Sequence, residues 1–407
     1  MKYHLITYGC QMNTADSEEM AQPLQDHGFL ATSKLHDAAI VLMNTCTVRE
    51  QAEHRADSNI GRLRLWKERD PNRILIIAGC AASRWGESIK TKYPFIDLVS
   101  PATRIEEFPE AVAKVLKERW NWSEETAANF NYERGSEGAS ERENPADSFN
   151  SANPSLLHSF APSLTPAPFL FGSDATAYIT IMRGCNLNCS YCIVPQVRGR
   201  EKYRPMTEIL AEIRAKATAG YQEVMLLGQT VNSYHYRSGT SIDFADLLRA
   251  VNSIDGVERI RFMSPHPRHM KDRVIQAMVE CSKAARHIHL PVQSGSDRLL
   301  AAMKRLYTRS EYLAIVDKLR GAIPALLLTT DIIVGYPGET DADFEETLSL
   351  LRQVRFDGLF AFKYSPRPGT TSAEEPDDVP DALKEERLQS VLALNTDIKK
   401  SALEVPA

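Results

Sequence analysis

The feature that most constrains the fold is a regular alternation of short apolar runs with helix-like segments. In the first part of the chain, strand candidates are separated by helical patterns. Such alternation is typical of a parallel sheet whose strands are joined by crossover helices. The sequence therefore predicts an open parallel α/β domain over residues 1–119. Its expected strands are 4–8, 40–44, 74–78 and 97–99, and its expected helices are 17–27, 49–67 and 85–93.

A second alternation begins after residue 172 and predicts another domain over residues 173–380. Six strand–helix units in a row indicate a full or partial β/α barrel. A charged helix is expected at 381–400, within a C-terminal helical tail over 381–407. The fold class is therefore α/β, with an open sheet followed by a partial barrel. The expected barrel strands are 177–182, 223–227, 260–262, 287–290, 327–334 and 359–364.

Residues 120–172 differ in composition from both domains, since they are rich in Asn, Ser, Glu and Pro. Such segments bury too little apolar surface to fold by themselves. A loop of this length inside one compact domain would be unusual. We therefore expect an acidic, flexible connection between the two domains.

Composition narrows the function classes. No run of about 18 apolar residues occurs, so no membrane-spanning helix is expected, and the N-terminus lacks the apolar core of a secretory signal. These features predict a cytoplasmic protein. The net charge of −5 does not indicate a nucleic-acid binder, although a local basic surface remains possible. The seven cysteines are odd in number, which argues against a disulfide framework in the cytosol.

Three of these cysteines, Cys185, Cys189 and Cys192, have the spacing Cys-x3-Cys-x2-Cys. They directly follow the first barrel strand, at the strand end where barrel active sites form. Thiolates suit iron–sulfur clusters or zinc, but zinc would need a fourth ligand at a matching spacing, and none lies close by in sequence. We therefore expect a cluster that leaves one iron open to a small molecule; chance spacing of structural cysteines is the alternative.

Another three cysteines, Cys10, Cys46 and Cys80, are far apart in sequence, yet each follows a predicted strand of the first domain. Ligands of open α/β sheets bind in a crevice beyond the carboxyl ends of the strands. The three thiols are therefore expected to converge on a second cluster with an open iron. Buried free thiols are the alternative, and they are the preferred interpretation for the remaining Cys281.

The Cys-x3-Cys-x2-Cys motif resembles that of the radical S-adenosylmethionine (SAM) enzymes. The resemblance implies that the open iron binds SAM, and that one electron cleaves SAM to a 5′-deoxyadenosyl radical. Glycine-bearing strand ends at 227–229 (LGQ), 293–296 (QSGS) and 333–339 (IVGYPGE) resemble the SAM-contacting edges of these barrels, although each alone also fits a plain turn. The expected cofactor contacts are Tyr191, Gly228, Gln229, Gln293, Ser294, Gly335 and Tyr336.

Nearly the whole chain, apart from residues 120–172, resembles the methylthiotransferase family of radical-SAM enzymes. Four segments are similar to the tRNA 2-methylthio-N6-isopentenyladenosine synthase branch: 9–13 (GCQMN), 44–50 (NTCTVRE), 264–267 (SPHP) and 364–370 (YSPRPGT). The resemblance implies two [4Fe-4S] clusters and two SAM molecules. One SAM methylates a sulfur at the N-terminal cluster; the other supplies the radical that removes hydrogen from adenine C2.

The same resemblance implies the partners. The target adenosine lies beside the anticodon of tRNA, in a loop where bases can be splayed out for recognition. An electron donor of flavodoxin or ferredoxin type and a sulfur source are expected, no membrane is involved, and the protein is expected to be a monomer. Residues near the two cysteine sets are the substrate-contact candidates, with helix caps and surface ion pairs as the alternative: Asn13, Glu18, Arg49, Arg198 and Arg200. Another basic group, which a solvated surface explains equally well, is Lys304, Arg305 and Arg309.

Two further functions remain open from the sequence. One is the same chemistry on threonylcarbamoyladenosine in tRNA or on a ribosomal protein. The other is a non-catalytic protein that stores clusters or passes electrons. Members of the resembled family normally end in a small β-barrel domain that grips tRNA, and the sequence stops near residues 404–407, about where that domain is expected to begin.

Overall fold

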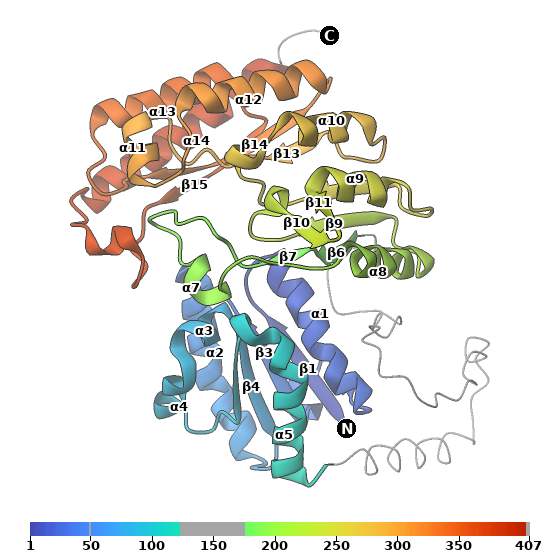
Figure 1. Cartoon of the computed structure of the whole chain (residues 1–407). Coiled ribbons are helices and arrows are strands. Elements are labelled where there is room, and N and C mark those ends of the chain that lie inside the picture. The colour runs from blue at the N-terminus through green and yellow to red at the C-terminus, as the bar shows by residue number, and fades with distance from the viewer. Residues whose placement is uncertain (49, 123–175, 404–407) are drawn as a thin grey trace. The chain divides into compact units, whose positions relative to one another are not determined.

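The structure is a computed structural model that describes residues 1–48, 50–122 and 176–403 of the 407-residue chain. The backbone divides into two compact units, residues 1–170 and 171–407 (Figure 1). Residues 123–172 of the predicted connection lie outside the described part of the chain, so that prediction stays open. Each unit is built around its own parallel strands.

The first unit contains a five-stranded sheet in the order β2-β1-β3-β4-β5, with every neighbouring pair parallel. Its strands are β1 (Lys2–Thr7), β2 (Leu30–Ala31), β3 (Ile40–Thr45), β4 (Ile74–Gly79) and β5 (Leu98–Pro101). Its α-helices are α1 (Gln11–Asp26), α2 (Glu50–Glu68), α3 (Cys80–Trp85), α4 (Ile89–Lys92) and α5 (Phe108–Trp120).

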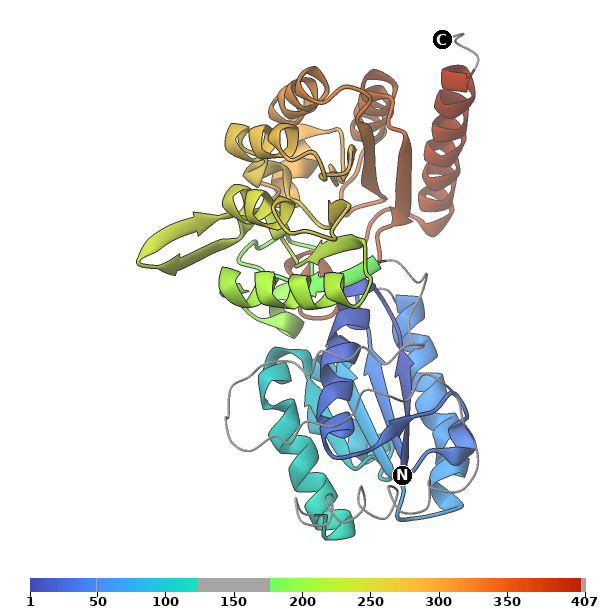
Figure 2. The ribbon, with the colours of Figure 1, turned by 90° about the vertical axis from the view of Figure 1, so that its right-hand side faces the viewer.

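Helices cover both faces of this sheet, which explains why β3 and β4 are apolar throughout. Ile40 and Leu42 of β3 face a core that contains side chains of α1 and α5. The alternate residues Val41 and Met43 face a second core with α2, α3 and α4. Both helical layers flank the strands in Figure 2. This two-residue alternation buries the central strands completely.

The second unit contains six parallel strands that follow one another in chain order. Parallel pairing joins β6, β9 and β12 in one set and β13, β14 and β15 in another, and a bridge between Ile260 and Ala284 connects the two sets. Among the described residues no pairing returns from β15 to β6. The barrel is therefore partial. The strands are β6 (Thr176–Thr180), β9 (Glu223–Leu227), β12 (Arg259–Phe262), β13 (His287–His289), β14 (Leu327–Val334) and β15 (Gly358–Lys363).

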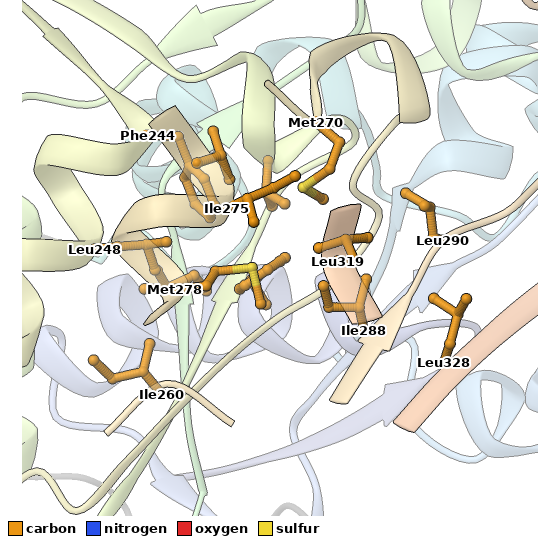
Figure 3. Close-up of a cluster of buried hydrophobic side chains, with 14 of the residues drawn as sticks. Phe244, Leu248, Ile260, Met270, Ile275, Met278, Ile288, Leu290, Leu319 and Leu328 are labelled. Carbon is orange, nitrogen blue, oxygen red and sulfur yellow. The ribbon is translucent and has the colours of Figure 1, made fainter. Parts of the chain in front are cut away.

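Helices alternate with these strands and bury their apolar faces against them. Phe244 and Leu248 of α9 meet Ile275 and Met278 of α10 in the core, beside Ile288 of β13 (Figure 3). The helices are α7 (Val194–Arg198), α8 (Met206–Thr218), α9 (Phe244–Asn252), α10 (Asp272–Glu280), α11 (Asp297–Ala302), α12 (Arg309–Ala322), α13 (Asp341–Val354) and α14 (Asp381–Leu403). Two antiparallel hairpins complete the unit: β7 (Met182–Arg183) with β8 (Lys202–Tyr203), and β10 (His235–Ser238) with β11 (Thr240–Asp243).

The predicted α/β class and partial barrel are confirmed, and the predicted strands differ from the observed ones only by a few end residues. The sequence does not predict β2 or the two hairpins. Three further details differ. The helix predicted from residue 17 begins at Gln11, and the one predicted over 85–93 is divided at Gly86, whose φ of 55° breaks it. The sequence pattern did not anticipate α5; Trp122, beyond this helix, is buried in the first unit's core.

Candidate functional site

Cys10, Cys46 and Cys80 lie at neighbouring strand ends of the first unit. In the sheet, β3 lies between β1 and β4. The register pairs Thr7 with Asn44 and Thr45 with Gly79. If these registers are extended past the strand ends, Cys46 is paired with Cys80 on one side and with Gly9 on the other. Cys10 directly follows Gly9. The loops that carry the three cysteines therefore lie at neighbouring strand ends, and a cluster shared by their thiols stays a prediction.

Two glycines let the cysteine-bearing loops approach one another closely. A β-carbon added to Gly9 would lie 2.6 Å from the Cys46 β-carbon and 2.9 Å from its Sγ. A β-carbon on Gly79 would overlap the Asn44 Oδ1 atom and lie 2.5 Å from the Thr45 carbonyl oxygen. Gly9 and Gly79 also have φ values of 116° and 93°, which disfavour a side chain.

Buried amide side chains tie these loops together. The Asn13 Nδ2 atom donates to the carbonyl oxygens of Tyr8 and Thr45, at 2.9 Å each. The Asn44 Nδ2 atom donates to the Asn13 carbonyl oxygen at 2.7 Å and to Ser17 Oγ at 2.9 Å. Asn13 thus connects the loop that precedes Cys10 with the loop that precedes Cys46.

Two of the three thiols also lie at helix N-termini. Cys10 is the N-cap residue of α1, and Cys80 is the first residue of α3. Unpaired N–H groups and the helix dipole favour negative charge there, which suits thiolate ligands. Cys10 is exposed, whereas Cys46 and Cys80 are buried. The arrangement has one accessible side, at Cys10, and a closed side within the sheet.

In the second unit, Cys185, Cys189 and Cys192 lie on a loop between β7 and α7. A backbone hydrogen bond from Cys185 to the Gly199 carbonyl closes the loop at 3.1 Å, and the Cys192 N–H donates to the Cys189 carbonyl at 3.0 Å. The Thr230 hydroxyl lies 3.3 Å from Cys185 Sγ, and the Leu187 N–H donates to the same sulfur. Backbone bonding thus gathers the three cysteines on one loop.

Residues that follow β9 and β14 contact this cysteine loop. The Gly184 N–H donates to Gln229 Oε1, so the Gln229 amide contacts the loop backbone directly. The Ser190 hydroxyl lies 2.8 Å from the Tyr336 hydroxyl and donates to the Ala302 carbonyl. Tyr336 is fully buried. Gln229 and Tyr336, both predicted cofactor contacts, are therefore placed beside the cysteine loop.

The other predicted cofactor contacts lie at the same end of the barrel strands. Gln293 has a φ of 77° and pairs through its backbone with Asp331 and Ile333 of β14. Ser294 is buried, with its hydroxyl 3.3 Å from Thr347 Oγ1. Tyr191, half-buried, accepts a hydrogen bond from Arg305. Gly228 and Gly335 pack against the side chains of Met182 and Lys384, respectively, at distances that leave no space for a β-carbon.

Comparison with known proteins identifies both units. The model of the "Radical SAM superfamily" matches residues 179–351, and that of "Uncharacterized protein family UPF0004" matches residues 2–101. A tRNA-2-methylthio-N(6)-dimethylallyladenosine synthase of Syntrophus aciditrophicus is 40% identical over 96% of this chain and 78% of its own length. The Thermoanaerobacter sp. (strain X514) enzyme of that name is 41% identical over 98% of this chain and 79% of its own length.

The chain belongs to this methylthiotransferase family. Membership makes it a radical-SAM enzyme that transfers a sulfur-containing group, with [4Fe-4S] clusters and SAM as cofactors. Solved structures agree on the fold. TsrM, a radical SAM methyltransferase from Kitasatospora setae, superimposes with a TM-score of 0.62 at 14% identity, covering 91% of this chain and 77% of its own. OxsB, a cobalamin-dependent SAM radical enzyme, superimposes with a TM-score of 0.57 at 12% identity. The match covers 98% of this chain and 56% of the OxsB chain.

The donor atoms fit the clusters of a methylthiotransferase. All six cysteines are free thiols. In the part of the chain that the structure describes, no three His, Cys, Asp or Glu side chains are grouped so as to hold a single metal ion. A four-iron cluster instead takes its thiolates at separate corners. That each cysteine set provides three ligands to a four-iron cluster and leaves one iron open stays a prediction.

Burial disfavours the charged thiolate form of two of the barrel cysteines. Burial raises the pKa of Cys192 to about 12, and the nearby Cys189 adds to the increase. Burial also raises the pKa of Cys185, against the opposing hydrogen bond from Thr230. Bound iron supplies the positive charge that a buried thiolate otherwise lacks.

The predicted substrate contacts of the methylthiotransferase are placed differently from one another. Asn13 is fully buried among the cysteine loops, and Glu18 is half-buried on α1. Arg198 is buried, whereas Arg200 is exposed on the loop that Gly184 touches. Arg49 lies outside the described residues. Contact of these residues with substrate stays a prediction.

Two buried cationic or polar groups near the barrel cysteines were not recognised as site residues from the sequence. Arg305, which had been grouped with exposed basic residues, is 5% exposed and donates to Cys189 Sγ at 3.5 Å. His266 is 6% exposed; its Nδ1 accepts from the Arg268 N–H, and its Nε2 has no partner. Burial, followed by the nearby charge of Arg305, lowers the pKa of His266 to about 2, so the ring is neutral. No pattern in the sequence indicates that Arg305 is buried.

Proposed function

We propose that this methylthiotransferase converts N6-isopentenyladenosine, next to the anticodon of tRNA, to its 2-methylthio derivative. The observation that carries the proposal is an identity of roughly 40% to synthases named for this product, in a chain that holds three cysteines in each of its two units. The similarity covers 96% and 98% of this chain, and so spans both units. We further propose that the enzyme is cytoplasmic and monomeric.

In the proposed reaction, each unit has its own task. Bound SAM and two four-iron clusters supply the radical and the methylthio group when present. Cys10, Cys46 and Cys80 hold the sulfur-donating cluster, with Cys10 on its accessible side. The cysteine loop of the barrel holds the cluster that binds SAM, and the strand ends carrying Gly228, Gln293, Ser294 and Gly335 position SAM. The barrel excludes water from the reacting atoms.

We expect RNA to contact exposed basic side chains near the barrel loop, of which Arg200 is the best placed. A loop adenosine loses no base pair when it enters a site, so the cost of unstacking it is small. Among the described helices, none is long and apolar enough to cross a membrane. An electron donor of flavodoxin or ferredoxin type and a replacement sulfur source complete the proposed cycle.

The proposal is tested with the anaerobically reconstituted chain, SAM, dithionite and an anticodon stem-loop that contains N6-isopentenyladenosine. We expect 5′-deoxyadenosine and the 2-methylthio nucleoside, both detected by mass spectrometry. The matched control is a stem-loop with unmodified adenosine. Production of 5′-deoxyadenosine without methylthiolation of this RNA, but with methylthiolation of a threonylcarbamoyladenosine stem-loop or a ribosomal protein, would contradict the substrate assignment.

A further inference from the structure

Arg305 is a buried charged residue next to an exposed apolar one, the opposite of the usual distribution. Its side chain is 5% exposed, whereas the adjacent Leu306 is 55% exposed and Lys304 is exposed. Lys304 and Leu306 have φ values of 54° and 62°, in the left-handed region that residues with a β-carbon rarely adopt. The backbone at Lys304 and Leu306 is therefore strained. In this conformation the Arg305 guanidinium is buried and the Leu306 side chain is exposed.

The partners of the Arg305 guanidinium are neutral groups and one cysteine. Nη2 donates to the Pro291 carbonyl at 2.9 Å, and Nε donates to the Tyr307 hydroxyl at 3.0 Å. Nη1 donates to the Tyr191 hydroxyl at 3.3 Å and to Cys189 Sγ at 3.5 Å. Among the described ion pairs, no carboxylate lies within 4.0 Å of Arg305. Four hydrogen bonds thus fix the Arg305 guanidinium, and its sulfur partner, Cys189, lies on the cysteine loop of the barrel.

A buried cation without a counter-charge destabilises the fold, because it loses its hydration without gaining an ionic partner. Carbonyl and phenol groups satisfy the N–H donors of Arg305 but carry no charge at neutral pH. The cluster on Cys185, Cys189 and Cys192 would supply that charge. A four-iron core of charge 2+ with three thiolates has one net negative charge, and reduction by one electron makes it two.

We propose that Arg305 is the buried counter-ion of the barrel cluster and a positioning residue that raises the cluster's reduction potential. Its attraction to the cluster grows when the cluster accepts an electron, so it favours the reduced form that delivers an electron to SAM. Hydrogen bonds and local charge are the means by which a protein adjusts such potentials. The inference rests on the cluster assignment in the proposed function, but not on the identity of the RNA substrate.

The test is a redox titration of the reconstituted full-length chain with dithionite, followed by electron paramagnetic resonance in the absence of RNA. In Arg305→Gln, we expect iron content near that of the unchanged protein and a lower midpoint potential. The expected shift is at least about tenfold in the equilibrium constant for reduction, or about 59 mV for one electron. Arg305→Lys keeps the charge and should recover most of the shift.

Lys304→Gln is the matched control, because it removes the same charge from the adjacent, exposed position. Solvent screens that charge, so its midpoint potential should not change. An unchanged midpoint potential in a cluster-loaded Arg305→Gln protein would overturn the proposal. It would also be overturned if the midpoint potential fell as far in Arg305→Lys as in Arg305→Gln. If Arg305→Gln does not take up iron, Arg305→Lys decides: loading with a potential near the original supports the counter-ion, and failure to load refutes it.

These outcomes separate the inference from the proposed function. A wild-type chain that shows a reducible four-iron cluster and SAM cleavage but no methylthiolated RNA would contradict the substrate and leave the Arg305 result interpretable. A wild-type chain without a reducible cluster would contradict the cluster assignment itself. The midpoint potential is measured independently of product formation in every case.

Discussion

At the scale of single residues, the N-terminal site depends on small and amide side chains as much as on its thiols. Gly9 and Gly79 permit the close approach of the three loops, and Asn13 connects two of them. Such buried hydrogen bonds matter mainly because their loss leaves a partner unsatisfied. Two predictions follow from this at the residue scale.

Replacing Asn13 with Ala should leave the Tyr8 and Thr45 carbonyls without their amide donor, at a cost of about 1–3 kcal/mol for each buried group. We expect iron content to fall from about eight toward about four per chain, because only the N-terminal cluster is affected. SAM cleavage should persist. Gln22→Ala is the control, since that amide binds the exposed Asp26 on the same helix. Equal iron content in the two variants would refute the role of Asn13.

Gly79→Ala should prevent assembly of the same cluster, because its methyl group would overlap Asn44 Oδ1 and crowd the Thr45 carbonyl. Gly86→Ala is matched, since Gly86 also has positive φ but no atom within 4 Å of an added β-carbon. We expect the thermal unfolding midpoint and the sulfide content to fall much more in Gly79→Ala. Similar losses in both variants would assign the effect to backbone conformation rather than to crowding.

At the scale of elements, α14 acts as part of the barrel rather than as a loosely attached tail. It packs on β15 and α13 (Figure 2). Arg387 of α14 is 3% exposed and donates to Glu339 Oε2 at 2.7 Å, and that carboxylate also accepts from the Gly335 N–H at 2.6 Å. Lys384 packs against Gly335 itself. The helix therefore supports the loop that the sequence predicted to contact SAM.

Arg387→Met should destabilise the protein by about 3–5 kcal/mol, because it leaves the buried Glu339 carboxylate without its partner. The Gly335 loop should loosen, and SAM affinity should fall in an equilibrium binding measurement with the cluster-loaded chain. Adding Glu339→Gln to this variant removes the unpaired buried carboxylate. The thermal unfolding midpoint of the double variant should therefore lie above that of Arg387→Met alone. Arg352→Met, at an exposed ion pair with Glu345, is the control and should cost at most about 1 kcal/mol. An equal loss in the control would contradict this account.

At the scale of the whole molecule, two compact units each carry one cysteine set on the carboxyl ends of parallel strands. Parallel strands direct all their carboxyl ends to one edge, so each unit collects its ligands there. The two cysteine sets can therefore be removed separately, which separates their chemical tasks.

Replacing Cys10, Cys46 and Cys80 together with Ala should halve the iron content, retain 5′-deoxyadenosine formation and abolish methylthiolation. The triple Ala variant of Cys185, Cys189 and Cys192 should also lose half the iron, but it should form no 5′-deoxyadenosine. Both are measured by iron analysis and by mass spectrometry of nucleosides. Loss of SAM cleavage in the first variant, with its remaining iron intact, would contradict the division of tasks.

Local patterns in the sequence predicted most of the parallel strands and the α/β class. The apolar run of β3 predicts a strand that is buried on both faces, and β14 is a longer strand whose burial alternates with the two-residue period. The Cys-x3-Cys-x2-Cys spacing places three thiols on one loop whatever the rest of the chain does. Because Cys10, Cys46 and Cys80 each follow a predicted parallel strand, the sequence also predicted that they group at one edge of the sheet.

Only the tertiary structure decided which polar residues serve these sites. Arg305 is adjacent to exposed residues in sequence, and its burial beside Cys189 results from backbone conformations at Lys304 and Leu306 that no residue period encodes. Asn13 and Arg387 likewise find their partners 32 and 48 residues away. Spacing along the chain determines local geometry, whereas these contacts depend on how distant segments pack, and packing is a property of the whole fold.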